Sequence, residues 1–276
     1  MKKINKIAVC FRKDGKKIEE QNSLMELFSL YGKLHGVTVV KAEENEGVAD
    51  LVVSGGGDGT FLDAARIAFI LNVPVAGINI GHMGFLTEIN PEETSMIEKL
   101  FTGNFSVNRR MMVDVTVSGE KRNAFNYTAL NEVLIHRETL SGMVSLRIEY
   151  NDERLPEYKG DGVMISTPTG STAYNLSCNG PIIYPTDNSI VINAIAPHAL
   201  THRPIVLPAD EGGVIKVHLK QCEAAVLLCD GKSSADVFKG DTVTIQKSKA
   251  SLQVVSNPDR SFFDILSEKL HFGRRM

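Results

Sequence analysis

A glycine-rich turn that contains one carboxylate is the part of this sequence with the clearest chemical potential. Residues 51–66 read LVVSGGGDGTFLDAAR, which predicts a short buried strand, a turn, and a helix that begins near Thr60. The helix would direct its free N–H groups and positive dipole end into the turn, which makes a main-chain anion site suited to phosphate. Four glycines are expected to adopt positive φ angles and admit a ligand closely: Gly55, Gly56, Gly57 and Gly59.

Asp58 distinguishes this turn from a simple phosphate cradle, because a carboxylate repels phosphate. Its presence is explained if it handles a hydroxyl that must lose a proton, or a Mg²⁺ ion that accompanies the phosphates. Ordinary turn chemistry in an α/β protein is the alternative. The P-loop signature is absent, and the G-x-G-x-x-G pattern fails because Thr60 or Leu62 occupies its last position. The turn therefore suggests phosphoryl transfer, with Gly56, Gly57 and Thr60 as phosphate-binding candidates.

The loop that follows the next strand is expected beside the glycine turn, at the same edge of the sheet. It reads IGHMGFLT over residues 80–87 and contains His82 and Phe85. Phe85 is a candidate for contact with a ligand, with core packing as its alternative role. For His82 the alternative is an ordinary loop histidine with satisfied hydrogen bonds.

In the second half of the chain, one polar pair interrupts an apolar strand and a second polar group precedes another strand. Asn131 and Glu132 lie within the apolar run 129–135, and adjacent strand residues face opposite sides. One of the two must therefore point inward or toward a cleft, where it needs a hydrogen-bond partner. Lys159 and Asp161 precede the strand predicted over 162–166.

A run of hydroxyl side chains follows that strand. Residues 167–177 read TPTGSTAYNLS, and residues 169–172 are placed to cap a short helix. Short hydroxyl donors and exposed amides suit ribose and phosphate oxygens. An ordinary Ser/Thr loop is the alternative.

Hydrophobic periodicity divides the chain into three parts. Over residues 1–105, strands alternate with helices, which predicts an α/β domain with a mainly parallel sheet. Its predicted strands are 7–11, 37–40, 51–54 and 74–79, and its helices 18–35, 60–71 and 91–101. Residues 106–256 change to closely spaced strands and predict an antiparallel, sandwich-like β domain. Residues 257–276 contain a helix, 262–270, expected to pack back on the first domain. A cleft between the two domains is a favoured place for a ligand.

The strands predicted for the second domain are ten in number: 111–117, 126–136, 144–150, 163–166, 190–196, 203–207, 214–219, 224–229, 242–246 and 252–255.

Composition excludes several classes of protein. The 276 residues carry a formal net charge of -3 with 43% hydrophobic and 23% charged residues, which argues against nucleic-acid binding and fits a soluble globular protein. No apolar run is long enough to cross a bilayer, and the first residues lack the apolar core of a signal peptide, so a cytoplasmic location is expected. The four cysteines show no metal-ligand spacing.

Taken together, these motifs resemble the NAD kinase family in order and spacing. They are GGDGT at 56–60, Asn131-Glu132, GDG at 160–162 and TPTGSTAY at 167–174, and the match continues through APHALTHRP at 196–204, Asp230-Gly231 and residues 262–273. The glycine motif is shared with diacylglycerol-type lipid kinases and more loosely with phosphofructokinases. The TPTGSTAY run is highly specific.

The resemblance implies phosphorylation of the adenosine 2′-hydroxyl of NAD by ATP with Mg²⁺, giving NADP. It implies an α/β domain joined to a β-sandwich-like domain, assembled as homodimers or homotetramers. Asp58 matches the catalytic carboxylate, with Gly59 beside it against the dinucleotide. Asn131 and Glu132 match positions that hold the adenosine. Lys159 and Asp161 match positions near the ribose and nicotinamide, and the pocket wall is matched by Thr169, Thr172, Ala173, Tyr174, Asn175 and Ser177.

Two departures from the family pattern concern the nicotinamide side. Lys232 stands where Gln or Glu is common, and Lys159 where Arg is frequent. Two other functions are compatible with parts of the sequence. A lipid kinase would share the glycine motif but gives no reason for the hydroxyl-rich run. A non-catalytic dinucleotide sensor would keep the binding residues without needing Asp58.

Overall fold

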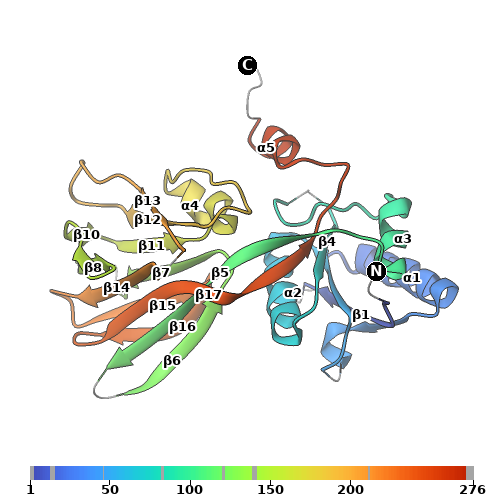
Figure 1. Ribbon diagram of the computed structural model, residues 1–276, viewed down its shortest axis with the longest axis horizontal. Helices are drawn as coiled ribbons and strands as arrows, with labels where there is room; N and C mark the ends of the chain where they lie inside the picture. The colour runs from blue at the N-terminus through green and yellow to red at the C-terminus, as the bar shows by residue number, and fades with distance from the viewer. Residues whose placement is uncertain are drawn as a thin grey trace. The chain divides into compact units, whose positions relative to one another are not determined.

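The computed structural model describes residues 3–12, 16–45, 47–81, 84–119, 122–138, 142–210 and 212–271 (Figure 1). The chain forms two compact units, one made of residues 1–109 and 252–276 and the other of residues 110–251. The first unit is therefore discontinuous in sequence. Among the described residues, no helix combines the length and apolarity that are needed to cross a membrane.

The first unit is built on a parallel sheet. Its strands lie in the order β4-β3-β1-β2, and the end of β17 joins beside β4, where Val254 pairs with Val75. The bounds are β1 Lys6–Phe11, β2 Thr38–Lys41, β3 Leu51–Gly56 and β4 Val75–Asn79, with helices α1 Ile18–His35, α2 Asp58–Leu71, α3 Thr94–Thr102 and α5 Phe262–Leu270, and a 3-10 turn at Ala42–Glu44.

The side chains on one face of β1 show how the hydrophobic core of this unit is formed. Ile7 and Val9 pack with Phe28 of α1 and Leu100 of α3, and all of these side chains are buried. Helix α2 packs on β3 and β1. The carboxyl ends of β1, β3 and β4 consequently reach one edge of the sheet, where ligands of open α/β sheets bind.

The second unit is a sandwich of two mainly antiparallel sheets. One contains β10-β8-β14-β17, with β5 beside β17, β6 beside β5 and β9 beside β8, and the other has the order β13-β12-β11-β7-β15-β16. Buried aliphatic side chains from both sheets form its core. The bounds are β5 Val107–Gly119, β6 Arg122–Ala129, β7 Glu132–Arg137, β8 Val144–Tyr150, β9 Glu153–Arg154, β10 Tyr158–Gly160, β11 Gly162–Ser166, β12 Ser189–Ile195, β13 Ile205–Pro208, β14 Val214–Leu219, β15 Ala224–Cys229, β16 Lys232–Phe238 and β17 Thr242–Val255, with a 3-10 turn η2 Thr169–Thr172 and a one-turn helix α4 Tyr174–Ser177.

The predicted fold class is confirmed, and the C-terminal helix has the predicted bounds because Ser261 and Asp264 form a capping box at its start. The start predicted for α3 is wrong. Residues 90–93 form a turn in which the Asn90 N–H donates to the Glu93 carboxylate, and the helix begins at Thr94.

Three strand predictions also change. The single strand predicted over 126–136 is two strands, β6 and β7, separated at Leu130 and Asn131. The two strands predicted over 242–246 and 252–255 are one continuous strand. The residues between them are mostly polar and lack the apolar alternation on which the prediction relied, but they belong to the same strand. Strand β16 was not predicted, since its sequence KSSADVF begins with polar residues.

Candidate functional site

The glycine turn joins β3 directly to α2. The helix begins at Asp58, two residues earlier than predicted, so Asp58 and Gly59 lie in its first turn and Gly57 is its N-cap. The N–H groups of Thr60 and Phe61 bond to the Gly57 carbonyl, and no side chain caps the helix. The free main-chain N–H groups of the first turn are therefore available to an anion.

The reason for glycine in this turn differs from the one predicted. None of the four glycines has a positive φ; Gly57, for example, has φ −97°. Two are required by packing, because a Cβ at Gly55 would overlap the Phe11 ring and one at Gly56 would overlap the Thr60 side chain. A Cβ at Gly57 or Gly59 would meet no atom within 4 Å. Gly57 and Gly59 thus leave the end of α2 bare toward open space.

Asp58 is half-buried, and its carboxylate is held by the loop after β4. The N–H of Phe85 donates to Oδ2 at 2.9 Å, and the N–H of Leu86 donates to Oδ1 at 3.0 Å. Gly84 completes this clamp because its own N–H donates to Thr87 Oγ1 at 3.0 Å, and a Cβ there would overlap Asp58 Oδ1. Each carboxylate oxygen keeps a further lone pair for a ligand. Asp58 is therefore oriented by main chain and still able to accept a proton.

The loop after β4 was predicted to lie beside the glycine turn, and residues 84–87 do so through these bonds. Phe85 is half-buried, and its contact with Asp58 is made by its main chain. His82 lies outside the described residues. Gly84 and Thr87 were missed as members of the site. In the sequence they are visible only as the glycine and threonine of the GFLT segment, and the spacing of these two residues matches no chemical motif.

In the second unit, Glu132 begins strand β7 and Asn131 directly precedes it, and Asp230 holds both in place. The carboxylate of Asp230 accepts hydrogen bonds from the N–H groups of Leu130, Asn131 and Glu132, at 3.0, 2.7 and 3.4 Å. Asp230 reaches them from the turn between β15 and β16, where both Asp230 and Gly231 have positive φ. These three hydrogen bonds to Asp230 separate the end of β6 from the start of β7. Asp230 was noted in the sequence only as part of the resemblance, and its position in a DG turn was the available signal.

Glu132 is buried, and burial together with the nearby charge of Asp230 raises its pKa to about 7. Its Oε2 atom has no hydrogen-bond partner among the residues that the structure describes, and the same is true of Asn131 Oδ1 and Thr169 Oγ1. Buried polar atoms of this kind cost free energy unless a partner is supplied. Three predicted ligand-binding side chains therefore keep unused hydrogen-bonding capacity.

The hydroxyl-rich run 167–177 packs directly on this corner. Thr167 donates from Oγ1 to the Leu130 carbonyl at 2.5 Å and accepts from the Gly170 N–H at 3.1 Å, which starts the turn η2. A Cβ at Gly170 would overlap the Asn131 carbonyl oxygen. Thr169 is thereby placed on the same corner as Asn131.

The remaining residues of the run divide into supporting and exposed positions. Asn175 is fully buried, and its amide bonds to the carbonyls of Ser171 and Pro181 and to the side chain of Asn193. The structure therefore gives Asn175 a supporting role. Thr172 and Ala173 are half-buried, while Tyr174 and Ser177 are exposed on α4. Asn193 was missed because it lies mid-strand in an apolar run.

Lys159 lies within β10, and Asp161 is the residue between β10 and β11 of the same unit. Asp161 forms an ion pair with Arg137, with Arg137 Nε 2.9 Å from Asp161 Oδ1. Burial is the main cause that raises the pKa of Tyr174, and the charge of Asp161 adds to it. Lys159 is partly exposed, 3.9 Å from the Glu157 carboxylate. The side chain of Lys232 lies outside the described part of the structure.

Within the described residues, no three His, Cys, Asp or Glu side chains gather as a metal-binding group. None of the four cysteines, all of which lie in the described part of the chain, forms a disulfide. The carboxylate of Asp58, with a further lone pair on each oxygen, is a donor of the kind that proteins use to hold Mg²⁺ together with phosphates.

Comparison with known proteins identifies both units. The model of the ATP-NAD kinase N-terminal domain matches residues 2–105, and that of the ATP-NAD kinase C-terminal domain matches residues 130–257. A NAD kinase of Magnetococcus marinus is 41% identical over 226 residues, covering 81% of this chain and 74% of that protein.

Solved structures agree with the fold. The yeast NADH kinase complexed with NADH superposes with a TM-score of 0.87 at 21% identity, covering 100% of this chain and 90% of that one. An NAD kinase from Archaeoglobus fulgidus in complex with ATP gives a TM-score of 0.76 at 27% identity, covering 96% and 98%. With both domain models matched in order over most of the sequence, the chain belongs to the ATP-NAD kinase family.

Proposed function

We propose that this chain transfers the γ-phosphoryl group of ATP to the 2′-hydroxyl of the adenosine ribose of NAD, giving NADP. The observation that carries the proposal is the clamped carboxylate of Asp58 at the bare N-terminus of α2. Family membership supports the substrates, since relatives are named NAD kinase and one neighbouring structure contains ATP. The lipid-kinase alternative has no support from any of these matches.

Asp58 is proposed as the catalytic base. Phosphoryl transfer passes through a loose transition state, so alignment and charge neutralisation matter more than early deprotonation of the hydroxyl. Asp58 would accept the 2′-hydroxyl hydrogen bond and take its proton late, a contribution of about 10²–10⁴-fold. The new bond joins the ribose oxygen to the γ-phosphorus, and the bond to the β-phosphate oxygen breaks, releasing ADP.

The phosphates are proposed to lie against the main chain of the glycine turn. Gly56 and Thr60 shape the turn by their contact, and the N–H groups of the first turn of α2 face an anion where Gly57 and Gly59 leave space. ATP enters as its Mg²⁺ complex, whose metal neutralises phosphate charge. Asp58 is the carboxylate of the turn that is available to such a complex.

The second unit is proposed to hold the dinucleotide. Asn131, Glu132 and Thr169 supply the unpartnered oxygens that adenosine donors can satisfy. Gly59, Phe85, Lys159 and Asp161 are proposed as further contacts, and Thr172, Ala173, Tyr174 and Ser177 as the wall, with Asn175 supporting it. Assembly as a homodimer or homotetramer is proposed from the family resemblance and is tested by sedimentation.

The test is direct. Purified protein is incubated with Mg·ATP and NAD, and the product is measured with an NADP-specific dehydrogenase. We expect NADP to accumulate with one ADP formed for each NADP. Tight NAD binding without ATP consumption would instead identify a dinucleotide sensor and refute the kinase assignment.

A further inference from the structure

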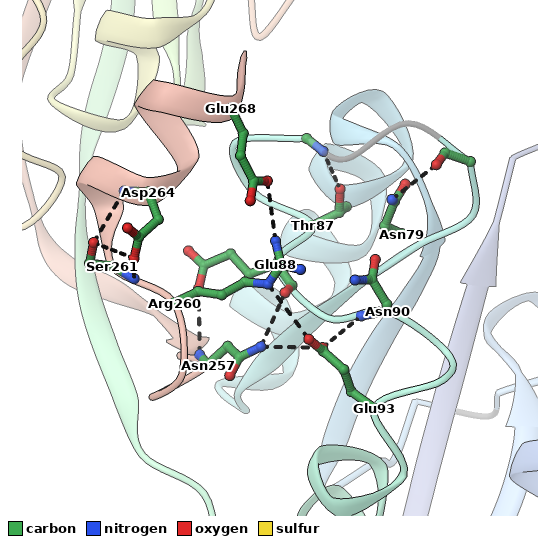
Figure 2. Close-up of polar contacts among 12 residues, drawn as sticks. Asn79, Thr87, Glu88, Asn90, Glu93, Asn257, Arg260, Ser261, Asp264 and Glu268 are labelled. Carbon is green, nitrogen blue, oxygen red and sulfur yellow. Dashed lines mark hydrogen bonds and ion pairs between the residues drawn. The ribbon is translucent and has the colours of Figure 1, made fainter. Parts of the chain in front are cut away.

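The segment that leads into α5 is fastened to the loop that clamps Asp58. Asn257 is buried at 3% exposure, and its side-chain N–H groups donate to the Glu88 carbonyl at 3.3 Å and to Glu93 Oε2 at 3.2 Å. Figure 2 shows Asn257 and Arg260 directed toward Glu88 and Glu93. These contacts join two parts of the first unit that are far apart in the sequence.

Glu93 is the centre of this network. Its Oε2 atom also accepts the N–H of Asn90 at 2.9 Å, while Arg260 Nε lies 3.6 Å from its Oε1 atom. Arg260 is paired in turn with Glu268 of α5 at 3.4 Å. One carboxylate therefore holds the end of the loop, the chain before α5 and, through Arg260, the helix itself (Figure 2).

Glu88, which Asn257 holds, lies only two residues after Leu86, which donates to Asp58. Phe85 and Leu86 donate to Asp58, Thr87 holds Gly84, and Glu88 is the next residue. Beyond it, Ile89 is bonded to β4 on both sides, through the N–H of Asn79 and the carbonyl of Gly77. Residues 84–88 therefore run from the Asp58 clamp to β4, and Asn257 donates to the last carbonyl of this segment, that of Glu88.

We infer that Asn257 is a positioning residue for phosphoryl transfer, which fixes the main chain at Glu88 and thereby the direction of the Asp58 carboxylate. The inference rests on the proposed function for its catalytic consequence but not for its structural one. The hydrogen bonds of Asn257 outside its own segment go to Glu88 and Glu93, and neither is a proposed ligand-binding residue. Its replacement should therefore lower turnover more than it weakens NAD binding.

The experiment compares Asn257→Ala with the parent enzyme. We expect kcat to fall about tenfold while KM for NAD stays within about twofold, because a displacement of the base affects the transition state more than ground-state binding. In an Asp58→Asn background, Asn257→Ala should lower the residual rate no further, since both changes disable the same base. An additional tenfold loss in that background, or an unchanged kcat in the single variant, would overturn the inference.

Ser261→Ala is the matched control. Ser261 belongs to the same segment, but its side chain caps α5 and does not contact Glu88 or Glu93. It should lower the melting temperature and leave kcat unchanged. A fall in kcat equal to that of Asn257→Ala would show that loosening of the tail alone is responsible, and the inference would be wrong.

Amide hydrogen exchange supplies a readout that does not depend on activity. The Phe85 and Leu86 amides are protected by Asp58, so Asn257→Ala should speed their exchange at least tenfold, and Ser261→Ala should not. If the parent enzyme makes no NADP, the proposed function fails while this exchange result still decides the positioning role. Should Asn257→Ala not fold, Arg260→Gln loses the ion pair to Glu93 and should speed exchange at the same two amides. Unchanged exchange in that variant would count against the inference.

Discussion

The carboxylate of Asp58 takes its direction from two main-chain N–H groups instead of from another side chain. Such an arrangement is stiff, because the donors cannot rotate away as a lysine or arginine could. In the Asp58→Asn variant, the amide nitrogen that replaces one oxygen would face a main-chain N–H and could accept neither that hydrogen bond nor a proton. The geometry therefore leads to a distinct prediction for this position.

We predict that Asp58→Asn lowers kcat about 10²–10⁴-fold while the NAD dissociation constant changes little. Turnover is measured with the coupled dehydrogenase assay and affinity by calorimetry. Asp50→Asn is a suitable control, because Asp50 also accepts two main-chain N–H groups, of Asn5 and Lys6, at the opposite end of β3. It should lower stability without lowering kcat. Normal turnover in Asp58→Asn would refute the base assignment.

Glu132 makes the stability of the protein depend on pH. The folded protein raises the pKa of Glu132 from 4.5 to about 7, so between these pH values the folded state holds a proton that the unfolded chain has lost. The free energy of unfolding therefore falls as the pH rises through this window, and the contribution is constant above it.

We predict that Glu132→Gln removes this dependence. Urea unfolding of the parent and the variant at pH 5, 6, 7 and 8 should show the variant gaining stability relative to the parent as the pH rises. The gain should level off above about pH 7, and NAD affinity should fall because one proposed contact is altered. A difference between the two proteins that stays constant with pH would contradict the shifted pKa.

At the scale of elements, the junction of β3 and α2 contains glycines that close packing requires and glycines that we propose leave room for a ligand. Gly56 contacts Thr60, whereas Gly57 and Gly59 face open space.

We predict that Gly56→Ala lowers stability and activity together. Gly57→Ala and Gly59→Ala should leave the fold intact, with Gly59→Ala stabilising α2 by about 0.5–1 kcal/mol, yet raise KM for ATP. Thermal unfolding and initial rates measure the two effects, and an unchanged KM in both variants would exclude phosphate from this turn.

The same junction shows what the sequence could and could not predict. The strand, the turn and the helix follow from apolar spacing and glycine content, and the bounds of α5 follow from its Ser-x-x-Asp cap. The reason for Gly55 and Gly56 does not follow from the sequence. These glycines are required by close packing against Phe11 and Thr60, whose positions are set by the tertiary fold.

Most of the features that the sequence did not predict depend on hydrogen bonds between residues far apart in the chain. The break between β6 and β7 depends on Asp230, which lies about a hundred residues further on, and the clamp on Asp58 depends on N–H groups of a kind that nearly every residue possesses. The clamp leaves no local pattern, and Asp230 leaves only the Asp-Gly dipeptide of its own turn. The chemistry of the candidate site was thus predictable by residue type, while the groups that orient it were not.

At the scale of the whole molecule, the proposal assigns most contacts of NAD to the second unit and the phosphates of ATP to the first. Hydrogen exchange should therefore show NAD protecting residues 130–134 and 167–173, and Mg·ATP protecting residues 56–61. Each ligand should also raise stability, by about 2.7 kcal/mol at a hundredfold excess over its dissociation constant. Protection of residues 56–61 by NAD alone, with none in 130–134, would reverse the assignment.

The first unit is interrupted in sequence by the second, and its final strand and Asn257 belong to the returning segment. On the ribosome, residues 1–109 must therefore wait until the whole of the second unit has been translated before their sheet gains its last neighbour. Until then Glu88 lacks the hydrogen bond from Asn257, although Ile89 can already bond to β4. On our inference, the Asp58 carboxylate of a nascent chain is therefore directed less firmly than that of the finished protein, and full activity should appear only after Asn257 has been translated.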